Sequence, residues 1–232
     1  MILIKRMITM GYKYLFTFQK TGLMIYISHL DLQRLFRRTI KSCGYKIIYS
    51  QGFNPHPKMS IAQPLSLGYI GLQEYMEIEL DSDIDPDLIK DNINDQLPDG
   101  VKITRVKKLS DDIKSISALT VYAEYSIDFS ETDILLSDNM INQFLSQEEI
   151  YGKRRQKKTK KIIEVPIKDK IISMAVEDGL LKFVVDCGSN SNLNPEILLK
   201  SFLIYFGYDN LDDILEKVCI TRNRILLKDN IV

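Results

Sequence analysis

Two histidines carry most of the acid–base chemistry that this sequence can offer. They are His29 and His56, and the 232-residue chain has no others. His29 has Ser28 and Asp31 close by in the chain, so its imidazole could act as a general acid or base. His29, His56 and Asp31 could instead bind a metal ion, but their spacing matches no standard site and we expect none. The interpretation that we favour is structural: both imidazoles form hydrogen bonds that hold a loop against a helix.

Four cations follow His29 at helical spacing. Arg34, Arg37, Arg38 and Lys41 stand at positions i, i+3, i+4 and i+7, which places them along one face of a helix. Like charges at these spacings repel one another, and a polyanion lying along the face would relieve the repulsion. This pattern favours contact with a phosphate backbone. The alternative is a solvated face whose cations pair with acidic residues between positions 81 and 95.

The segment 49–58, YSQGFNPHPK, has an unusual composition. Gly52 permits a turn that other residues resist, while Pro55 and Pro57 stiffen the chain. Such a loop could display aromatic rings for base stacking and a cation for phosphate. Its candidate binding residues are Tyr49, Phe53, Asn54, His56 and Lys58. Residue types alone favour the alternative, a structural connector in which Phe53 is buried and His56 bonds to the backbone.

A basic run occupies residues 153–161, KRRQKKTKK, with seven cations in nine residues. We expect a loop here, which is either mobile and solvated or in contact with nucleic acid. The candidate binding residues of this basic run are Lys153, Arg154, Arg155, Lys157 and Lys158.

Composition excludes several classes of protein. The charged residues balance to a formal net charge of zero, so the chain is no bulk polycation that coats nucleic acid. Three scattered cysteines and the lack of an apolar leader or of a long apolar stretch predict a cytoplasmic protein without a membrane segment. Either Met1 or Met10 could be the translation start. No phosphate-binding glycine motif, HExxH or CxxxCxxC cluster is present, and we expect no cofactor.

The elements that must position these residues alternate between strand and helix periodicity. In the first half the pattern predicts strands and helices in the order β-α-β-β-α-β, over residues 12–19, 28–43, 46–49, 74–80, 86–97 and 101–107, with another extended piece at 59–62. In the second half it predicts strands and helices over residues 121–129, 138–146, 150–155, 171–176, 180–186, 195–205 and 218–227, where Asp178-Gly179 forms a hairpin turn.

This order predicts an α+β protein of two ferredoxin-like units, each an antiparallel sheet with helices on one face. We expect an N-terminal tail at 1–9, a first unit at 10–108, a linker at 109–119 and a second unit at 120–232. The alternative is a single irregular α+β domain.

The motifs SHLDLxRxxRR and YSxGFNPHPK, within residues 18–80, closely resemble the bacterial radical SAM-associated domain of unknown function. That domain occurs alone or fused behind radical SAM proteins. Its genes tend to lie beside those of ribonuclease G and of large-subunit ribosomal proteins. The resemblance therefore implies a link to RNA processing or ribosome biology and a radical SAM protein as partner, but it implies no catalytic residue.

Three functional hypotheses follow. The first is a non-catalytic RNA-binding or adaptor protein. The second is a metal-independent RNA endonuclease resembling the CRISPR repeat-processing nucleases, with His29 as general base and Lys58 or Arg34 stabilising the phosphate. The third is a purely protein-binding partner that docks through its SHLD and GFNPHP segments. The oligomeric state stays open.

Overall fold

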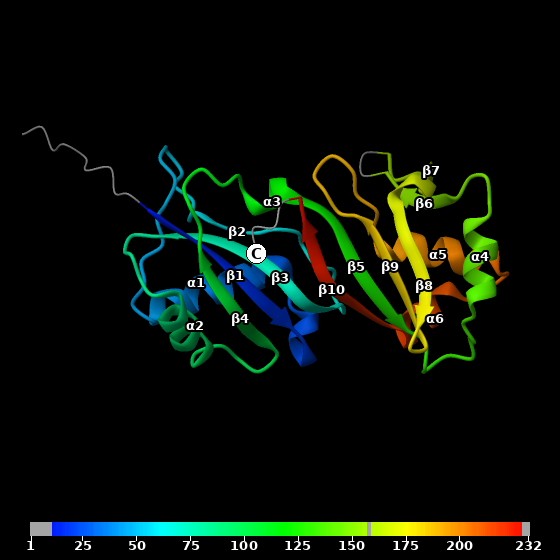
Figure 1. Cartoon of the computed structure of the whole chain (residues 1–232), viewed down its shortest axis with the longest axis horizontal. Coiled ribbons are helices and arrows are strands. Elements are labelled where there is room, and N and C mark those ends of the chain that lie inside the picture. Colours follow the sequence, from blue (N-terminus) through cyan, green and yellow to red (C-terminus); the bar gives the residue numbers. More distant parts are fainter. Residues whose placement is uncertain (1–10, 157–158, 229–232) are drawn as a thin grey trace, which may run out of the picture. The chain divides into compact units, whose positions relative to one another are not determined.

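The computed structural model describes residues 11–156 and 159–228 (Figure 1). The chain divides into two compact units. Among the described residues, the first unit runs to Leu67 and resumes over Glu74–Ile116, and the second comprises Gly68–Gln73 and the residues from Ser117 onward. Both units combine strands with helices, which confirms the predicted α+β class. No helix in the described part of the chain is long and apolar enough to cross a membrane.

The first unit is built around a sheet with the strand order β4-β1-β3-β2. Its elements are β1 (Tyr12–Lys20), a 3-10 helix η1 (Gly22–Tyr26), α1 (His29–Ser42), β2 (Met59–Ile61), β3 (Ile70–Leu80), α2 (Pro86–Asn94), β4 (Val101–Lys108) and the start of α3 (Ile116–Leu119). β1 pairs with β4, and β2 with β3, in antiparallel fashion. The strand β3 belongs to the second unit up to Gln73 and to the first from Glu74.

Helices α1 and α2 cover one face of this sheet (Figure 1). The alternating aromatic residues of β1 and the apolar stripe of α1 meet there, and Phe18 packs edge-on against Phe36 with ring centroids 5.0 Å apart. From α2, Ile89 and Ile93 join the same core and are fully buried. Burying these apolar side chains is the main source of stability for the unit. It also leaves the opposite, cationic side of α1 facing solvent.

The second unit has a sheet with the strand order β10-β5-β9-β8. Its elements are β5 (Thr120–Asp128), α4 (Asp138–Leu145), β6 (Tyr151–Arg155), β7 (Ile162–Pro166), a 3-10 helix η2 (Lys168–Lys170), β8 (Ile171–Glu177), β9 (Leu180–Asp186), α5 (Pro195–Tyr205), α6 (Leu211–Lys217) and β10 (Cys219–Leu227). Ile70 and Gly71 of β3 pair in parallel with β10. β6 and β7 form a separate antiparallel hairpin.

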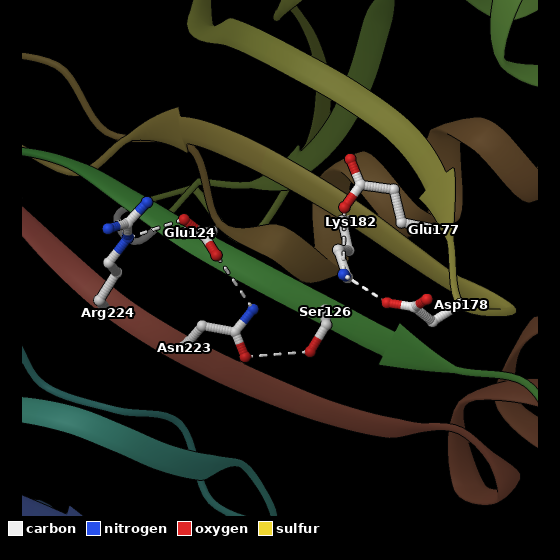
Figure 2. A network of polar contacts seen from close by, with 7 residues as sticks. All are labelled: Glu124, Ser126, Glu177, Asp178, Lys182, Asn223 and Arg224. Carbon is white, nitrogen blue, oxygen red and sulfur yellow. Dashed lines mark hydrogen bonds and ion pairs between the residues drawn. The ribbon is translucent and has the colours of Figure 1, made fainter.

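One face of the second sheet is polar, and its charges are paired (Figure 2). The Glu124 carboxylate accepts from Arg224 at 2.8 Å and from the Asn223 amide at 3.5 Å. On the neighbouring strand, the Lys182 ammonium lies 3.1 Å from Glu177 and 3.2 Å from Asp178. Because each cation on this face has a carboxylate partner, we do not place a phosphate-binding surface here.

Residues 46–49 differ from the expected elements and residues 150–155 agree with them. Residues 46–49 form no regular strand and pair through isolated bridges, Ile47 with Leu80 and Tyr49 with Pro57. The strand predicted over residues 150–155 is confirmed as β6, and the first three cations of the basic run, Lys153, Arg154 and Arg155, form its end. Strand alternation places Lys153 and Arg155 on one face of the hairpin and Arg154 on the other, while the partner strand β7 is chosen by tertiary packing.

Candidate nucleic-acid interface

The start of α1 is fixed by Ser28, which caps the helix. The Ser28 hydroxyl accepts from the Asp31 backbone N–H at 3.1 Å and donates to the Asp31 carboxylate at 2.7 Å. These bonds satisfy a free N–H at the helix start and place a negative charge in the first turn, where the helix dipole favours it. They hold down the pKa of Asp31, and the neighbouring Arg34 lowers it further. Ser28 and Asp31 therefore act in capping the helix.

The cations of α1 divide into one that is paired and three that are not. Arg34 forms an ion pair with Asp31 of its own helix at 2.8 Å. Arg37, Arg38 and Lys41 are exposed and have no ion-pair partner among the residues that the structure describes. In the described chain, no acidic residue between positions 81 and 95 forms an ion pair with these three cations, so the alternative of a neutralised face has no support there. Three uncompensated positive charges remain along one side of the helix.

Two of these cations line a cleft of about 340 Å³, which we call the cationic pocket. Its lining residues are Arg37, Lys41, Tyr45, Lys46, Ile47 and Tyr49. Lys46 is exposed and likewise has no ion-pair partner in the described chain. Tyr49 is half-exposed, and Tyr45 is anchored because its hydroxyl accepts from the Asn92 amide at 2.7 Å. The lining holds three cations and two aromatic rings but no carboxylate.

The pocket exists because the chain reverses directly after α1. Gly44 adopts a positive φ of 81°, a conformation that glycine takes without steric cost, and this ends the helix. The Tyr45 backbone N–H then donates back to Ile40 at 3.1 Å, and the Ile48 N–H donates to Glu79 of β3 at 2.9 Å. Residues 45–49 are thereby held beside the last turns of α1. Sequence reasoning missed Tyr45 and Lys46; the only signal was Gly44 at the helix end.

The loop that follows is closed by its own hydrogen bonds. The Ser50 N–H donates to the His56 carbonyl at 2.8 Å, and the His56 N–H donates to the Ser50 hydroxyl at 2.9 Å. Phe53 at the tip is fully exposed, and Asn54 and His56 are exposed beside it. The connector interpretation, with Phe53 buried, is therefore wrong for Phe53. The same interpretation predicted a hydrogen bond between His56 and the backbone. The structure shows backbone hydrogen bonds of His56 with Ser50.

The Lys58 ammonium is paired with a carboxylate and is not available to bind a phosphate. It lies 2.5 Å from the Glu79 carboxylate in an ion pair. The Lys58 backbone also pairs with the chain on both sides, donating to Ile48 at 2.7 Å and accepting from Glu79 at 3.0 Å. This residue closes the base of the loop.

His29 lies at a small cavity inside the first unit. The cavity encloses about 10 Å³, close to the room that one water molecule needs, and its lining includes the buried side chains of Lys20 and Glu74. Burial lowers the pKa of the His29 imidazole, and the positive charge of Lys20 lowers it further. In the described chain, no group of three or more His, Cys, Asp or Glu side chains is arranged to hold a metal ion, so His29, His56 and Asp31 form no such site.

The basic run contributes to a different surface. Lys153 and Arg155 lie on the same face of β6 as Tyr151, and all three line a groove of the second unit, whereas Arg154 lies on the other face. Lys157 and Lys158 lie outside the described residues. None of the described cations of the run lines the cationic pocket.

The chain belongs to a bacterial protein family of uncharacterised activity. The model of that family, described as "Uncharacterized protein conserved in bacteria (DUF2344)", matches residues 13–195, which include the cationic pocket, the loop at 50–57 and His29. A comparison with curated proteins found no match. Among solved structures, the crystal structure of an unknown protein from Galdieria sulphuraria is similar over 94% of this chain and 100% of its own, with 10% identity and a TM-score of 0.29. That score is too low to assign a common fold.

Proposed function

We propose that this protein is a non-catalytic RNA-binding adaptor, and that its first unit holds a single-stranded segment of RNA at the cationic pocket. The observation that carries the proposal is the pocket's lining: Arg37, Lys41 and Lys46, which have no ion-pair partner within residues 11–156 and 159–228, beside Tyr45 and Tyr49. Cations in a cleft attract the phosphate backbone, and exposed rings offer faces on which unpaired bases stack. Because no carboxylate is among its lining residues, the pocket does not repel the phosphates of the RNA.

A single strand suits this site better than a duplex. The pocket is a cleft formed by a helix end and a reversed segment, with the half-exposed ring of Tyr49 at its edge and the exposed Phe53 in the adjoining loop. Aromatic rings reach bases only where these are unstacked, as in loops and single strands. The resemblance to the radical SAM-associated domain, with its link to RNA processing, favours RNA over DNA and suggests a radical SAM protein as partner.

The arrangement of strands supports a ferredoxin-like architecture for both units. In the first unit the chain order β-α-β-β-α-β is combined with the strand order β4-β1-β3-β2. The second unit repeats this strand order as β10-β5-β9-β8, with the hairpin β6–β7 inserted after α4. We infer two ferredoxin-like units from this correspondence. A shared architecture does not by itself indicate a shared activity.

The surroundings of His29 support an adaptor rather than a nuclease. A general base must come within hydrogen-bond reach of the hydroxyl that it deprotonates. His29 lines a cavity with room for about one water, next to the buried Lys20 and Glu74, and does not line the cationic pocket. We therefore assign the imidazole a structural role within the first unit.

The test is binding of a short fluorescein-labelled oligouridylate, followed by anisotropy. The triple variant Arg37→Gln, Lys41→Gln, Lys46→Gln should bind about tenfold or more weakly, because it loses three phosphate contacts. Arg34→Gln is the matched control, since Arg34 lies on the same helix but already pairs with Asp31. It should bind within about twofold of wild type.

Equal weakening by the control, or no oligouridylate binding by the wild type, would overturn the proposal. The labelled RNA should also stay intact after incubation without metal ions. Discrete products that vanish in a His29→Ala variant would support a nuclease instead.

A further inference from the structure

The second unit contains a groove with a volume of about 720 Å³. We call it the hairpin groove. One wall is the face of the hairpin β6–β7 that carries Tyr151, Lys153 and Ile162, and the opposite wall is α5 with Ile204 and Tyr205. Ile162 is 70% exposed, and the other three apolar side chains are between 44% and 49% exposed. Such a gathering of half-exposed apolar side chains around a cleft is typical of a binding site.

The hairpin is held firmly on α5, so the groove is largely formed in advance. Gly152 packs against Ile197 so closely that a Cβ atom would collide with it, and the Ser201 hydroxyl donates to the Tyr151 carbonyl at 2.6 Å. Tyr205 is braced by aromatic neighbours: its ring lies 5.7 Å from Phe144 and 4.9 Å from Phe206, both edge-on. A braced surface loses little conformational entropy when a ligand binds.

The charges of the groove favour a protein ligand over a nucleic acid. Three carboxylates, Glu149, Glu164 and Glu196, line it, so an RNA strand with a negative charge on every nucleotide meets repulsion along its length, whereas a peptide can place a single carboxylate beside Lys153 and Arg155. Two of them are engaged, because Glu149 accepts from the Tyr151 hydroxyl and Glu196 pairs with Lys200 at 2.7 Å. The cationic pocket of the first unit has no carboxylate at all, so the two clefts differ in kind.

The hairpin nevertheless leaves two positive charges available at the groove. Lys153 has no ion-pair partner in the described chain. Arg155 donates its Nε–H to the Lys160 carbonyl at 3.1 Å and has no carboxylate partner there either. A ligand with apolar side chains for the aromatic wall and a carboxylate for these cations would complement both parts of the surface.

We propose that the hairpin groove binds an extended, acidic and apolar peptide segment of a partner protein. Aromatic or aliphatic side chains of the segment pack between Ile162 and Tyr205, and a neighbouring Asp or Glu pairs with Lys153 and Arg155. This site does not depend on RNA binding, because its residues lie in the second unit and share nothing with the cationic pocket.

The test uses a phage-displayed library of random peptides, selected on the immobilised full-length chain. Selected peptides should combine aromatic or aliphatic residues with net negative charge, and they should bind the wild type in solution by anisotropy. Ile204→Asp places a charge on the apolar wall and should weaken their binding about tenfold or more. Lys153→Glu with Arg155→Glu should weaken acidic peptides to a similar degree. Lys114→Glu, an exposed lysine of the first unit, is the matched control and should leave binding unchanged.

Three outcomes would overturn the proposal. One is a selection that yields no peptide sensitive to Ile204→Asp. Another is enrichment of basic peptides, which the two cations would repel. The third is binding of labelled oligouridylate that Ile204→Asp abolishes, which would make the groove an RNA site. Binding of the same RNA to the triple variant Arg37→Gln, Lys41→Gln, Lys46→Gln tests the proposed RNA-binding function by itself. A failure of the peptide-binding proposal can therefore be distinguished from a failure of the RNA-binding proposal.

Discussion

The protonation of His29 bears on the stability of the first unit. Burial and the charge of Lys20 lower the pKa of its imidazole below the ordinary value of 6.5. An unfolded chain therefore takes up the proton more readily than the folded one in the range between the lowered pKa and 6.5. It follows that this residue's contribution is fully favourable above about pH 6.5 and is lost as the pH falls below that value.

We predict that the free energy of unfolding decreases on acidification below about pH 6.5, and that His29→Gln removes part of this decrease. Urea denaturation on both sides of that pH, for wild type and variant, measures the effect. An identical pH dependence in the two proteins would show that another group is responsible.

Tyr49 is the residue on which base stacking at the cationic pocket rests. Its ring is 50% exposed, whereas Tyr45 is anchored through its hydroxyl. Tyr49→Ala should weaken oligouridylate binding by about 1–3 kcal/mol, and Tyr49→Phe should retain most of it, because stacking needs the ring and not the hydroxyl. Tyr26→Ala, which removes an exposed tyrosine that does not line the pocket, should have no effect on affinity. Equal losses for both alanine variants would refute stacking at Tyr49.

At the scale of elements, α1 is the structure that carries the candidate site. Its core side is secured by Leu32, Phe36 and Ile40, all buried, and its start by the Ser28 cap. The cationic residues can therefore be exchanged without removing the contacts that hold the helix in place. This separation of roles allows the cations to be tested independently of stability.

We predict that Ser28→Ala lowers the free energy of unfolding by about 1 kcal/mol, because a backbone N–H of the first turn loses its acceptor. Ser28→Thr keeps a hydroxyl and should lose much less. Chemical denaturation of both variants gives the comparison. A Ser28→Ala protein as stable as wild type would mean that water replaces the cap at no cost.

At the scale of the whole molecule, the formal net charge of zero determines how RNA binding should respond to salt. A chain without excess positive charge cannot hold RNA by its average field, so binding must come from local clusters. If the three cations of the cationic pocket carry it, the logarithm of the binding constant should fall with the logarithm of salt concentration with a slope of about −2, at about 0.7 per neutralised phosphate.

Anisotropy titrations at several salt concentrations measure this slope. The variant without the three cations should show a slope near zero. A much steeper wild-type slope would mean that further cations, such as the basic run, also meet the RNA.

The local elements of this protein were largely predictable from its sequence, because their signals are local. The helix predicted over 28–43 is present as α1, and the helix predicted over 195–205 is present as α5, where the Asn194 side chain accepts from the Glu196 backbone N–H. The hairpin β8–β9 turns at Asp178-Gly179, both with positive φ. Short-range patterns missed the helix α6 over Leu211–Lys217 and gave residues 46–49 a strand that the structure lacks.

The sites depended on the tertiary structure. The sequence alone established that cations line one side of α1 and that two prolines stiffen the loop after it. Only the fold decided that Arg37 and Lys41 have no ion-pair partner among the described residues, and that Lys58 is paired with Glu79. It also brought Lys46 beside the helix through the reversal at Gly44. The physical reason is that helix periodicity acts over a few residues of chain, whereas ion pairing and burial depend on distances through space between segments far apart in the sequence.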